Sequence, residues 1–293
     1  MSDVFFRKLA VFGVGLIGGS FALALKRAGV VQQVVGVGRS AANLARAVEL
    51  QAIDEAAVDS ASALAGADLV LVAVPVQQTR QVLQQIAGYL EPGAAVTDGG
   101  STKRDVVAAA AAALGVKLKQ FVPAHPIAGA ELSGVQAASA DLYRGRTVVI
   151  TPIPQAAPDI RARVEQAWHA CGARLVEMTP QHHDAVLAAV SHLPHALAFA
   201  LVDMIAGRTD AAELFSFAGA GFRDFTRIAS SSPEMWRDIC LANRDLLLAE
   251  VSDYRAQLAR IEEYLQRADG AALERMFETA RAARNAWLRT AKS

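Results

Sequence analysis

Cysteine is scarce in this sequence. Cys171 and Cys240 are the only two among 293 residues, and they lie far apart in the chain. Such a pair provides neither a disulfide framework nor a metal-binding cluster, so we predict no metal ligands. Free thiols are typical of a reducing compartment, and we therefore expect a cytoplasmic protein.

An excess of either charge is absent as well. Lysine and arginine together number 29, aspartate and glutamate also number 29, and the formal net charge is zero. This balance offers no electrostatic footprint for nucleic acid or for an anionic membrane, and we expect a small-molecule partner instead. Hydrophobic residues make up 53% of the 293 positions, enough for a sizeable core and for two domains of ordinary size.

One long run without charge lies near the N-terminus. Arg7 and Lys8 precede residues 9–25, "LAVFGVGLIGGSFALAL", which resemble the charged and apolar regions of a secretory signal. Glycine and serine interrupt the run at five positions, which argues against a membrane helix. We find no other stretch long and apolar enough to span a bilayer, and we predict no membrane association.

Strand-like and helix-like segments alternate through residues 1–180. Strands are expected at 8–12, 33–37, 68–75, 94–98, 120–124, 146–152 and 173–178. Helices are expected from the glycine-rich turn to residue 28 and at 41–51, 77–90, 102–114 and 158–171. Such alternation predicts a doubly wound parallel sheet.

A glycine motif, Gly13-Val14-Gly15-Leu16-Ile17-Gly18, follows the first strand and opens a helix. In this setting the first glycine permits a tight turn, the second admits a pyrophosphate, and the third allows close packing of helix on strand. A glycine-rich turn without a ligand is the alternative. We predict a dinucleotide site that includes Gly13, Gly15, Leu16, Ile17, Gly18, and Val74 and Pro75 after the 68–75 strand.

The second strand lacks the acidic residue that NAD sites usually place at its end. The chain continues with Arg39 and Ser40, and no acid occurs before Glu49. A guanidinium and a hydroxyl suit a 2′-phosphate, so we predict NADP as the cofactor, with NAD as the alternative. A solvated arginine at a helix start would also give this pattern.

Residues 181–293 lack the strand pattern and form a second, helical domain. One helix is expected at 182–206, with Pro194 kinking it or freeing a carbonyl, then a glycine-rich connector at 216–230 and a final helix at 271–290. Residues 234–267 predict one long helix whose apolar positions approach a heptad seam. Such a seam needs a partner helix, so we predict a homodimer through the C-terminal helices.

Six segments of the chain form a specific set when taken in order. They are "VFGVGLIGGSFALAL", "DLVLVAVPV", "VTDGGSTK", "AHPIAGAELSG", "SHLPHALAFAL" and "GFRDFTRIASSSPEMWRDI". In them the sequence resembles the prephenate/arogenate dehydrogenase family of tyrosine biosynthesis. The resemblance implies a Rossmann-type domain followed by an all-α dimerisation domain. It also implies NAD(P)-dependent oxidative decarboxylation of prephenate or L-arogenate, to 4-hydroxyphenylpyruvate or L-tyrosine.

The resemblance assigns roles to four residues of this chain. The family's catalytic histidine falls on His125 and its nearby serine on Ser101, while its carboxylate-binding arginine falls on Arg227 and a substrate-pocket histidine on His195. A neutral imidazole at position 125 could accept a hydrogen bond from the substrate hydroxyl as hydride leaves. No residue distinguishes prephenate from arogenate.

Structural interpretations compete with these roles. A strand-end histidine can be satisfied by backbone, Ser101 or Thr102 could cap the 102–114 helix, and Arg227 could pair with Asp224 on the surface. His182, His183 and His192 are expected to be structural or solvent-facing, and Trp236 and Phe222 are expected to lie in the core rather than stack on substrate.

Two other functions fit the same domain plan. One is that of a reductase of β-hydroxy acids or imines; the β-hydroxy acid group relies on a helical lysine, but residues 181–288 contain none. A cofactor-sensing protein without turnover would have no need of the combination of His125, Ser101 and Arg227.

Overall fold

The structure is a computed structural model of the chain, and it describes residues 5–129 and 134–290. Its contacts divide the chain into two compact units, residues 1–244 and 245–293. The domain boundary at 180/181 stays a prediction. Glu131 of the "AHPIAGAELSG" segment lies outside the described residues.

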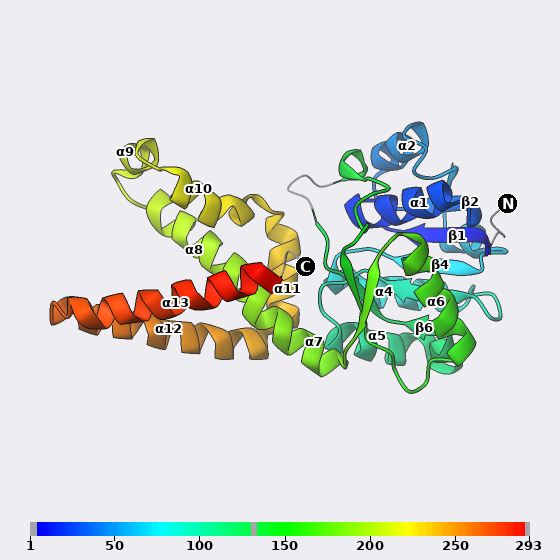
Figure 1. The fold of residues 1–293 in the computed structure, drawn as a ribbon. Helices are drawn as coiled ribbons and strands as arrows, with labels where there is room; N and C mark the ends of the chain where they lie inside the picture. Colours follow the sequence, from blue (N-terminus) through cyan, green and yellow to red (C-terminus); the bar gives the residue numbers. More distant parts are fainter. Residues whose placement is uncertain (1–4, 130–133, 291–293) are drawn as a thin grey trace. The chain divides into compact units, whose positions relative to one another are not determined.

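A parallel sheet forms the centre of the first unit (Figure 1). Within the described residues its strands are β1 (Phe6–Phe12), β2 (Val31–Val37), β3 (Glu55–Ala56), β4 (Leu69–Val72), β5 (Ala95–Asp98) and β6 (Phe121–Val122). Their order is β3-β2-β1-β4-β5-β6, and the direction of winding reverses between β1 and β4. Phe12 is level with Val72, and Val72 with Asp98, so the loops that follow β1, β4 and β5 meet at one edge.

Helices cover both faces of this sheet. They are α1 (Leu16–Ala28), α2 (Ala41–Glu49), α3 (Ser60–Leu64), α4 (Val76–Ala87), α5 (Arg104–Leu114) and α6 (Pro158–Ala170). Alternate residues of β1 enter different clusters: Val11 packs with Phe21 and Trp168 on one face, and Phe12 with Leu83 on the other. The predicted doubly wound sheet is therefore confirmed.

The expected strand at 120–124 is wrong as a single element. It divides into β6 and β7 (Ala124–Pro126), and β7 joins a separate sheet in the order β7-β8-β9, with β8 (Thr147–Ile150) and β9 (Arg174–Glu177). β7 and β8 are antiparallel, whereas one parallel sheet was expected. Pro123 lies between β6 and β7 and has no N–H to continue a ladder, so the chain changes sheets there.

Helices follow from residue 180 onward. The expected 182–206 helix consists of α7 (Pro180–Leu187), a π-helical segment (Ala188–His192) and α8 (Leu193–Ala206). Pro194 lacks the N–H that an α-helical ladder needs, which explains the wider π turn just before it. The expected connector contains α10 (Ala220–Thr226), preceded by α9 (Ala211–Ser216).

The helical run Pro180–Ala206 is long and apolar enough to cross a membrane, by length and composition only. Its most apolar window has a mean hydropathy of 1.8 and is 28% buried. The expectation that no second stretch of this kind exists was therefore wrong. A single such helix is a weak indication of a membrane span, because core and interface helices share its composition.

The long helix expected at 234–267 is interrupted. The structure has α11 (Pro233–Ala242) and α12 (Arg244–Gln266), with Asn243 between them at φ −110° and ψ 28°. The Asn243 side chain donates to the carbonyl oxygen of Asp184 at 2.8 Å, a tertiary bond that holds this residue outside the helical region. Trp236 of α11 packs with Val76 and Ile239, so the expected core position of Trp236 is confirmed.

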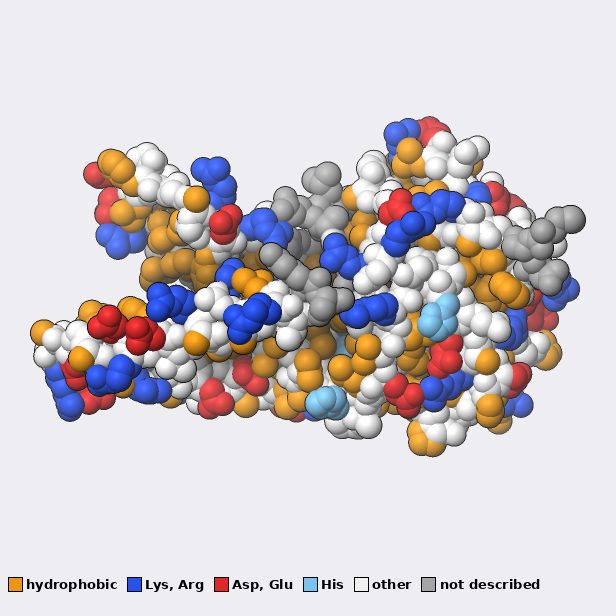
Figure 2. Space-filling model, viewed as in Figure 1, with side chains coloured by type: hydrophobic (Ala, Val, Ile, Leu, Met, Phe, Trp, Pro, Cys, Tyr) orange, Lys and Arg blue, Asp and Glu red, His pale blue; other side chains and the backbone are white. Residues whose placement is uncertain are grey.

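The second unit contains the rest of α12 and the last helix, α13 (Gly270–Thr290). Several large apolar side chains of α12 are exposed, namely Leu248, Val251, Leu258 and Leu265. The last three recur at intervals of seven residues, which places them along one stripe. Figure 2 shows hydrophobic side chains among the charged ones on these helices.

Candidate active site

The glycine loop between β1 and α1 has the geometry of a phosphate cradle. Gly13 has a φ of +99°, and a Cβ there would overlap the carbonyl oxygen of Ala73. A Cβ at Gly18 would overlap the Gly13 carbonyl oxygen, whereas one at Gly15 would meet nothing within 4 Å. Gly15 precedes α1 and forms no side-chain cap, so the amides of the first helical turn face this open space. The loop therefore fits a pyrophosphate.

The other predicted cofactor residues surround this loop. Leu16 and Ile17 begin α1, while Val74 and Pro75 follow β4, and all four are half-buried. Asn43 of α2 donates to the carbonyl oxygen of Val14 at 2.7 Å and so holds α2 against the loop.

Arg39 and Ser40 follow β2 at the same edge of the sheet. Arg39 is exposed. Ser40 caps α2, because its hydroxyl oxygen accepts a hydrogen bond from the Asn43 amide at 3.2 Å. A capping hydroxyl still has a hydrogen to donate, so a contact with a 2′-phosphate stays a prediction.

His125 lies in β7, opposite Val149 of β8, and is 9% exposed. Its Nδ1 atom lies 2.8 Å from Nε2 of His183, and Nδ1 of His183 lies 2.7 Å from Oδ1 of Asp184. His183 and Asp184 are both in α7, and neither was predicted at the site. His183 is fully buried, so it is not solvent-facing.

Burial lowers the pKa of His125 well below 6.5, and electrostatic interactions with His183, Lys103 and His192 lower it further. The imidazole of His125 is therefore neutral at physiological pH. A neutral ring has one nitrogen that can accept a hydrogen bond.

A buried ion pair fixes the chain beside His125. Lys103 pairs with Asp98, and both side chains are almost completely buried. Asp98 also accepts hydrogen bonds from the amides of Gly100 at 2.8 Å and Ala124 at 3.0 Å. The loop that contains Ser101 is thereby tied to the strand of His125.

Ser101 is half-buried and does not cap α5. The N-cap position is Lys103, which forms no side-chain cap, and Thr102 also precedes it. The Asp184 carboxylate accepts hydrogen bonds from the backbone amides of Lys103 at 2.8 Å and Arg104 at 2.9 Å, and so replaces a local cap of α5. The capping interpretation of Ser101 was therefore wrong, which leaves its hydroxyl outside the helix terminus.

His195 and Arg227 form a second group in the helical part of the first unit. The His195 ring stacks on Trp236, with centroids 3.6 Å apart and an interplanar angle of 18°. Nδ1 of His195 donates to the carbonyl oxygen of Ser191 at 2.9 Å. Burial lowers the pKa of His195; the bond to Ser191 raises it, and the charge of Arg227 lowers it. Arg227 therefore acts electrostatically on His195, and its own side chain is exposed.

Trp236 is a core residue that also contacts both histidines of the "SHLPH" segment. The His192 and Trp236 ring centroids lie 6.1 Å apart, and His192 Nδ1 lies 3.1 Å from the Asn243 side-chain nitrogen. His192 is buried, as the structural interpretation expects. Phe222, by contrast, is only half-buried, and it packs edge-on against Phe215.

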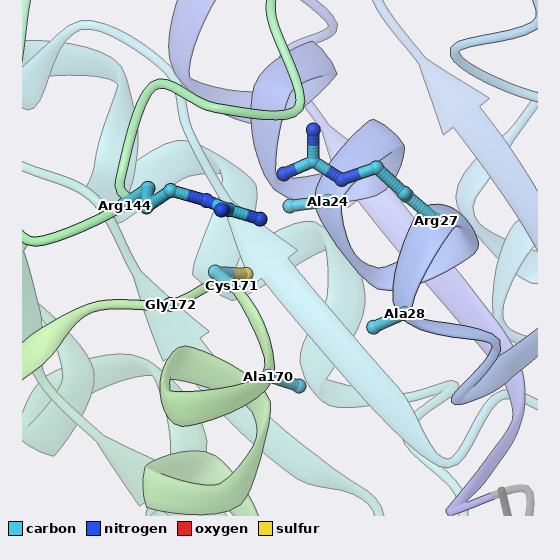
Figure 3. A pocket seen from close by; sticks show the side chains of 7 residues that line it. All are labelled: Ala24, Arg27, Ala28, Arg144, Ala170, Cys171 and Gly172. Carbon is cyan, nitrogen blue, oxygen red and sulfur yellow. The ribbon is translucent and has the colours of Figure 1, made fainter.

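A separate hollow of about 420 Å³ opens beside the C-terminal end of α1 (Figure 3). Arg27 and Arg144 line it, and both pair with Asp141, at 2.8 and 3.2 Å. Burial raises the pKa of the Cys171 thiol in its wall. Because the glycine loop is at the opposite end of α1, this hollow is not part of the nucleotide site.

A parallel sheet with a phosphate-binding glycine loop at its carboxyl edge, and a neutral histidine beside that edge, define a nicotinamide-dependent oxidoreductase. The model of the prephenate dehydrogenase nucleotide-binding domain matches residues 21–177, and that of the prephenate dehydrogenase dimerization domain matches residues 179–279. The chain belongs to the prephenate dehydrogenase family.

Individual relatives agree with this membership. The chain is 37% identical to a prephenate dehydrogenase of Bacillus subtilis, over 92% of this chain and 73% of that protein. It is 33% identical to a cyclohexadienyl dehydrogenase of Zymomonas mobilis, over 95% of each. A crystal structure of Aquifex aeolicus prephenate dehydrogenase with hydroxyphenyl propionate and NAD⁺ has a TM-score of 0.86 at 37% identity, and the match covers 93% of this chain and 96% of that one.

These findings establish the activity as NAD(P)-dependent oxidative decarboxylation of prephenate or arogenate. The family model of the first domain begins at residue 21, after the glycine motif. The assignment of that motif therefore depends on its own geometry.

Proposed function

We propose that His125 accepts the hydrogen bond of the substrate's ring hydroxyl during this reaction, with Ser101 as a second contact to the hydroxyl or to His125. The observation that carries the proposal is a buried, neutral imidazole whose Nδ1 is engaged by His183 at 2.8 Å. Its Nε2 is then the nitrogen left for the substrate.

A bound nicotinamide supplies the hydride acceptor in this reaction. The protein's part is to hold the substrate and to manage one proton. As the C–H bond beside the hydroxyl breaks, the oxygen gains carbonyl character and its hydrogen becomes acidic. An acceptor positioned at Nε2 of His125 stabilises the positive charge that develops on the hydroxyl group. Such positioned acid–base catalysis typically raises the rate by ~10²–10⁴-fold. Loss of carbon dioxide returns an electron pair to the ring, which becomes aromatic, and the proton stays with the phenol.

Arg227 and His195 bind a substrate carboxylate in this proposal. A guanidinium can hold a carboxylate through two parallel hydrogen bonds. The electrostatic coupling of Arg227 to His195 supports a shared role for the two side chains. The stacking of His195 on Trp236 would hold its ring in place.

The cofactor preference is for NADP. Arg39 is exposed beyond the carboxyl end of β2, the position where NAD sites carry an acid. An exposed guanidinium there is free of the burial that would prevent it from reaching a 2′-phosphate.

The protein acts as a cytoplasmic homodimer in which residues 181–293 form the helical dimerisation domain and residues 1–180 bind the nucleotide. The exposed apolar stripe of α12 supports a helical partner, as does the apolar run Pro180–Ala206, most of whose residues are exposed or only partly buried. A second copy of the chain would cover both.

The test is a comparison of His125→Ala with His182→Ala, an exposed histidine that serves as the matched control. Rates are measured with prephenate and arogenate, each with NAD and NADP. We expect His125→Ala to lower kcat by ~10²-fold or more with cofactor binding intact, and the control to behave as the wild type. The wild-type rate should fall with pH only below 6.5, because burial lowers the pKa of His125. A near-normal kcat in folded His125→Ala, with a lowered melting temperature, would assign His125 a structural role.

A further inference from the structure

Three buried side chains form a continuous hydrogen-bonded row behind the site. The row runs from the Asp184 carboxylate through the His183 ring to Nδ1 of His125, with separations of 2.7 and 2.8 Å. Asp184 and His183 are each at most 1% exposed, and His125 is 9% exposed. The row is buried from end to end, so its hydrogens can be followed from donor to acceptor, starting at the Asp184 carboxylate.

The Asp184 carboxylate fixes the first proton. Burial by itself would raise the pKa of Asp184, but hydrogen bonds from His183 and from the Arg104 and Lys103 amides outweigh it and hold that pKa below its usual range. An ionised carboxylate only accepts, so Nδ1 of His183 must carry the hydrogen of the 2.7 Å bond.

The remaining protons follow in sequence. If the His183 ring carries only this Nδ1 hydrogen, its lone pair is on Nε2, which then accepts from Nδ1 of His125. His125 then carries its own lone pair on Nε2. The opposite arrangement, with hydrogen on Nε2 of His183, would place hydrogen on Nε2 of His125 and turn the required acceptor into a donor.

We propose that His183 and Asp184 are positioning residues that hold His125 in the tautomer with an unprotonated Nε2, and so make it an acceptor for the substrate hydroxyl. This inference rests on the role proposed for His125. As the O–H hydrogen shifts toward Nε2 of His125, the Nδ1 hydrogen of His125 can shift toward His183, whose positive charge then lies against Asp184. Both hydrogens return when the phenol forms, so no proton is gained or lost.

Other charges near His125 do not supply this orientation. Lys103 is paired with Asp98, and Arg104 contacts the Asp184 carboxylate with its Nε at 3.2 Å. His192 is held by Asn243 at 3.1 Å. Of the described residues that affect His125, only His183 forms a hydrogen bond with its ring.

Two substitutions of His183 separate the links of the row. Gln places an amide near the position of the histidine Nε2, so His183→Gln can still accept from His125 but loses Asp184. Asn places its amide near the position of Nδ1, so His183→Asn keeps the contact with Asp184 but leaves His125 without an acceptor. Both leave Asp184 on the amides at the start of α5. We expect kcat to fall about 10²-fold in His183→Asn and by no more than about 10-fold in His183→Gln, with KM nearly unchanged in both.

Nitrogen NMR of ¹⁵N-histidine protein supplies a readout that packing alone would not alter. In the wild type, Nε2 of His125 should give the signal of an unprotonated ring nitrogen at pH 7. In Asp184→Asn the side chain can donate to His183, so we expect the His125 signal to shift to the protonated-Nε2 form and kcat to fall about 10²-fold or more. Asp184→Asn also weakens the contact at α5, so its melting temperature is measured alongside.

The outcomes distinguish the two proposals. Equal kcat in His183→Asn and His183→Gln, or an unchanged His125 signal in Asp184→Asn, overturns the positioning role while leaving His125 as the acceptor. A normal kcat in His125→Ala overturns the proposed function itself. Loss of kcat in His125→Ala and His183→Asn, with partial rescue in His183→Gln, supports both.

Discussion

Protonation of His192 should destabilise the folded protein at mildly acidic pH. Burial lowers the pKa of His192 to about 4; the charge of Asp184 opposes this, and His183 and His195 add to it. An unfolded chain binds the proton near pH 6.5, whereas the folded one resists it down to about pH 4. This stability is therefore fully present above the unfolded pKa and is lost as pH falls through that window. The whole difference corresponds to about 3 kcal/mol, of which roughly 2 kcal/mol is lost by pH 5.

Urea unfolding at pH 7 and pH 5 measures this loss in the wild type and in His192→Asn. Asn keeps an acceptor near the position of Nδ1 for Asn243 but does not titrate. Trp236 lies 6.1 Å from His192, so tryptophan fluorescence includes a probe of this region. His125 and His195 also have lowered pKa values, and their contributions cancel between the two proteins. The wild type should lose about 2 kcal/mol more than His192→Asn, at equal protein concentration. Equal losses in these two proteins, with exposed His182→Asn behaving as the wild type, would refute the reasoning.

Three further predictions concern binding and assembly. Arg39→Ala should weaken the binding of NADP by ~10–150-fold, the equivalent of one charged hydrogen bond of ~1.5–3 kcal/mol, and leave the binding of NAD nearly unchanged. Titrations of both cofactors measure these affinities, and a wild type that prefers NAD would contradict the prediction. Arg227→Ala should raise KM for the substrate strongly at unchanged cofactor affinity, and a normal KM would make Arg227 a surface residue. Light scattering at micromolar concentration should show a dimer. Leu258→Glu on the exposed stripe of α12 should weaken this dimer more than Glu262→Gln does. A monomeric wild type would contradict the homodimer.

The parallel sheet could be predicted because the sequence patterns that specify it are local. Each central strand is an apolar run, and the glycine motif specifies a turn, a close approach and a helix start within six residues. The division of 120–124 between two sheets was harder to predict. Pro123 signals the end of a ladder, but only the tertiary structure provides β8 as the new partner of β7.

His125 could be proposed as a site residue from the sequence because its motif is contiguous, whereas His183 and Asp184 lie in no such motif. A pair of histidines followed by an aspartate near a helix start reads as a polar, solvated turn. Its meaning depends on β7, some 58 residues away in the sequence, which brings His125 against His183. The cap of α5 was missed for the same reason, since the carboxylate that caps it lies about 80 residues further along the chain.

Asp184 also explains why the heptad pattern overestimated the length of the helix expected at 234–267. Helix propensity and apolar spacing both continue through residue 243, so a local reading joins α11 to α12. Asn243, however, donates to the Asp184 carbonyl at 2.8 Å and accepts from Arg104 at 2.8 Å, and Arg104 in turn contacts the Asp184 carboxylate. If the helix continued through Asn243, its side-chain amide would move away and leave these buried partners without a hydrogen bond. Each partner lost in this way would cost ~1–3 kcal/mol of stability. The polar cluster that surrounds His183 thus also sets where a helix ends, and Asn243→Ala should affect both the helix boundary and the orientation of Asp184.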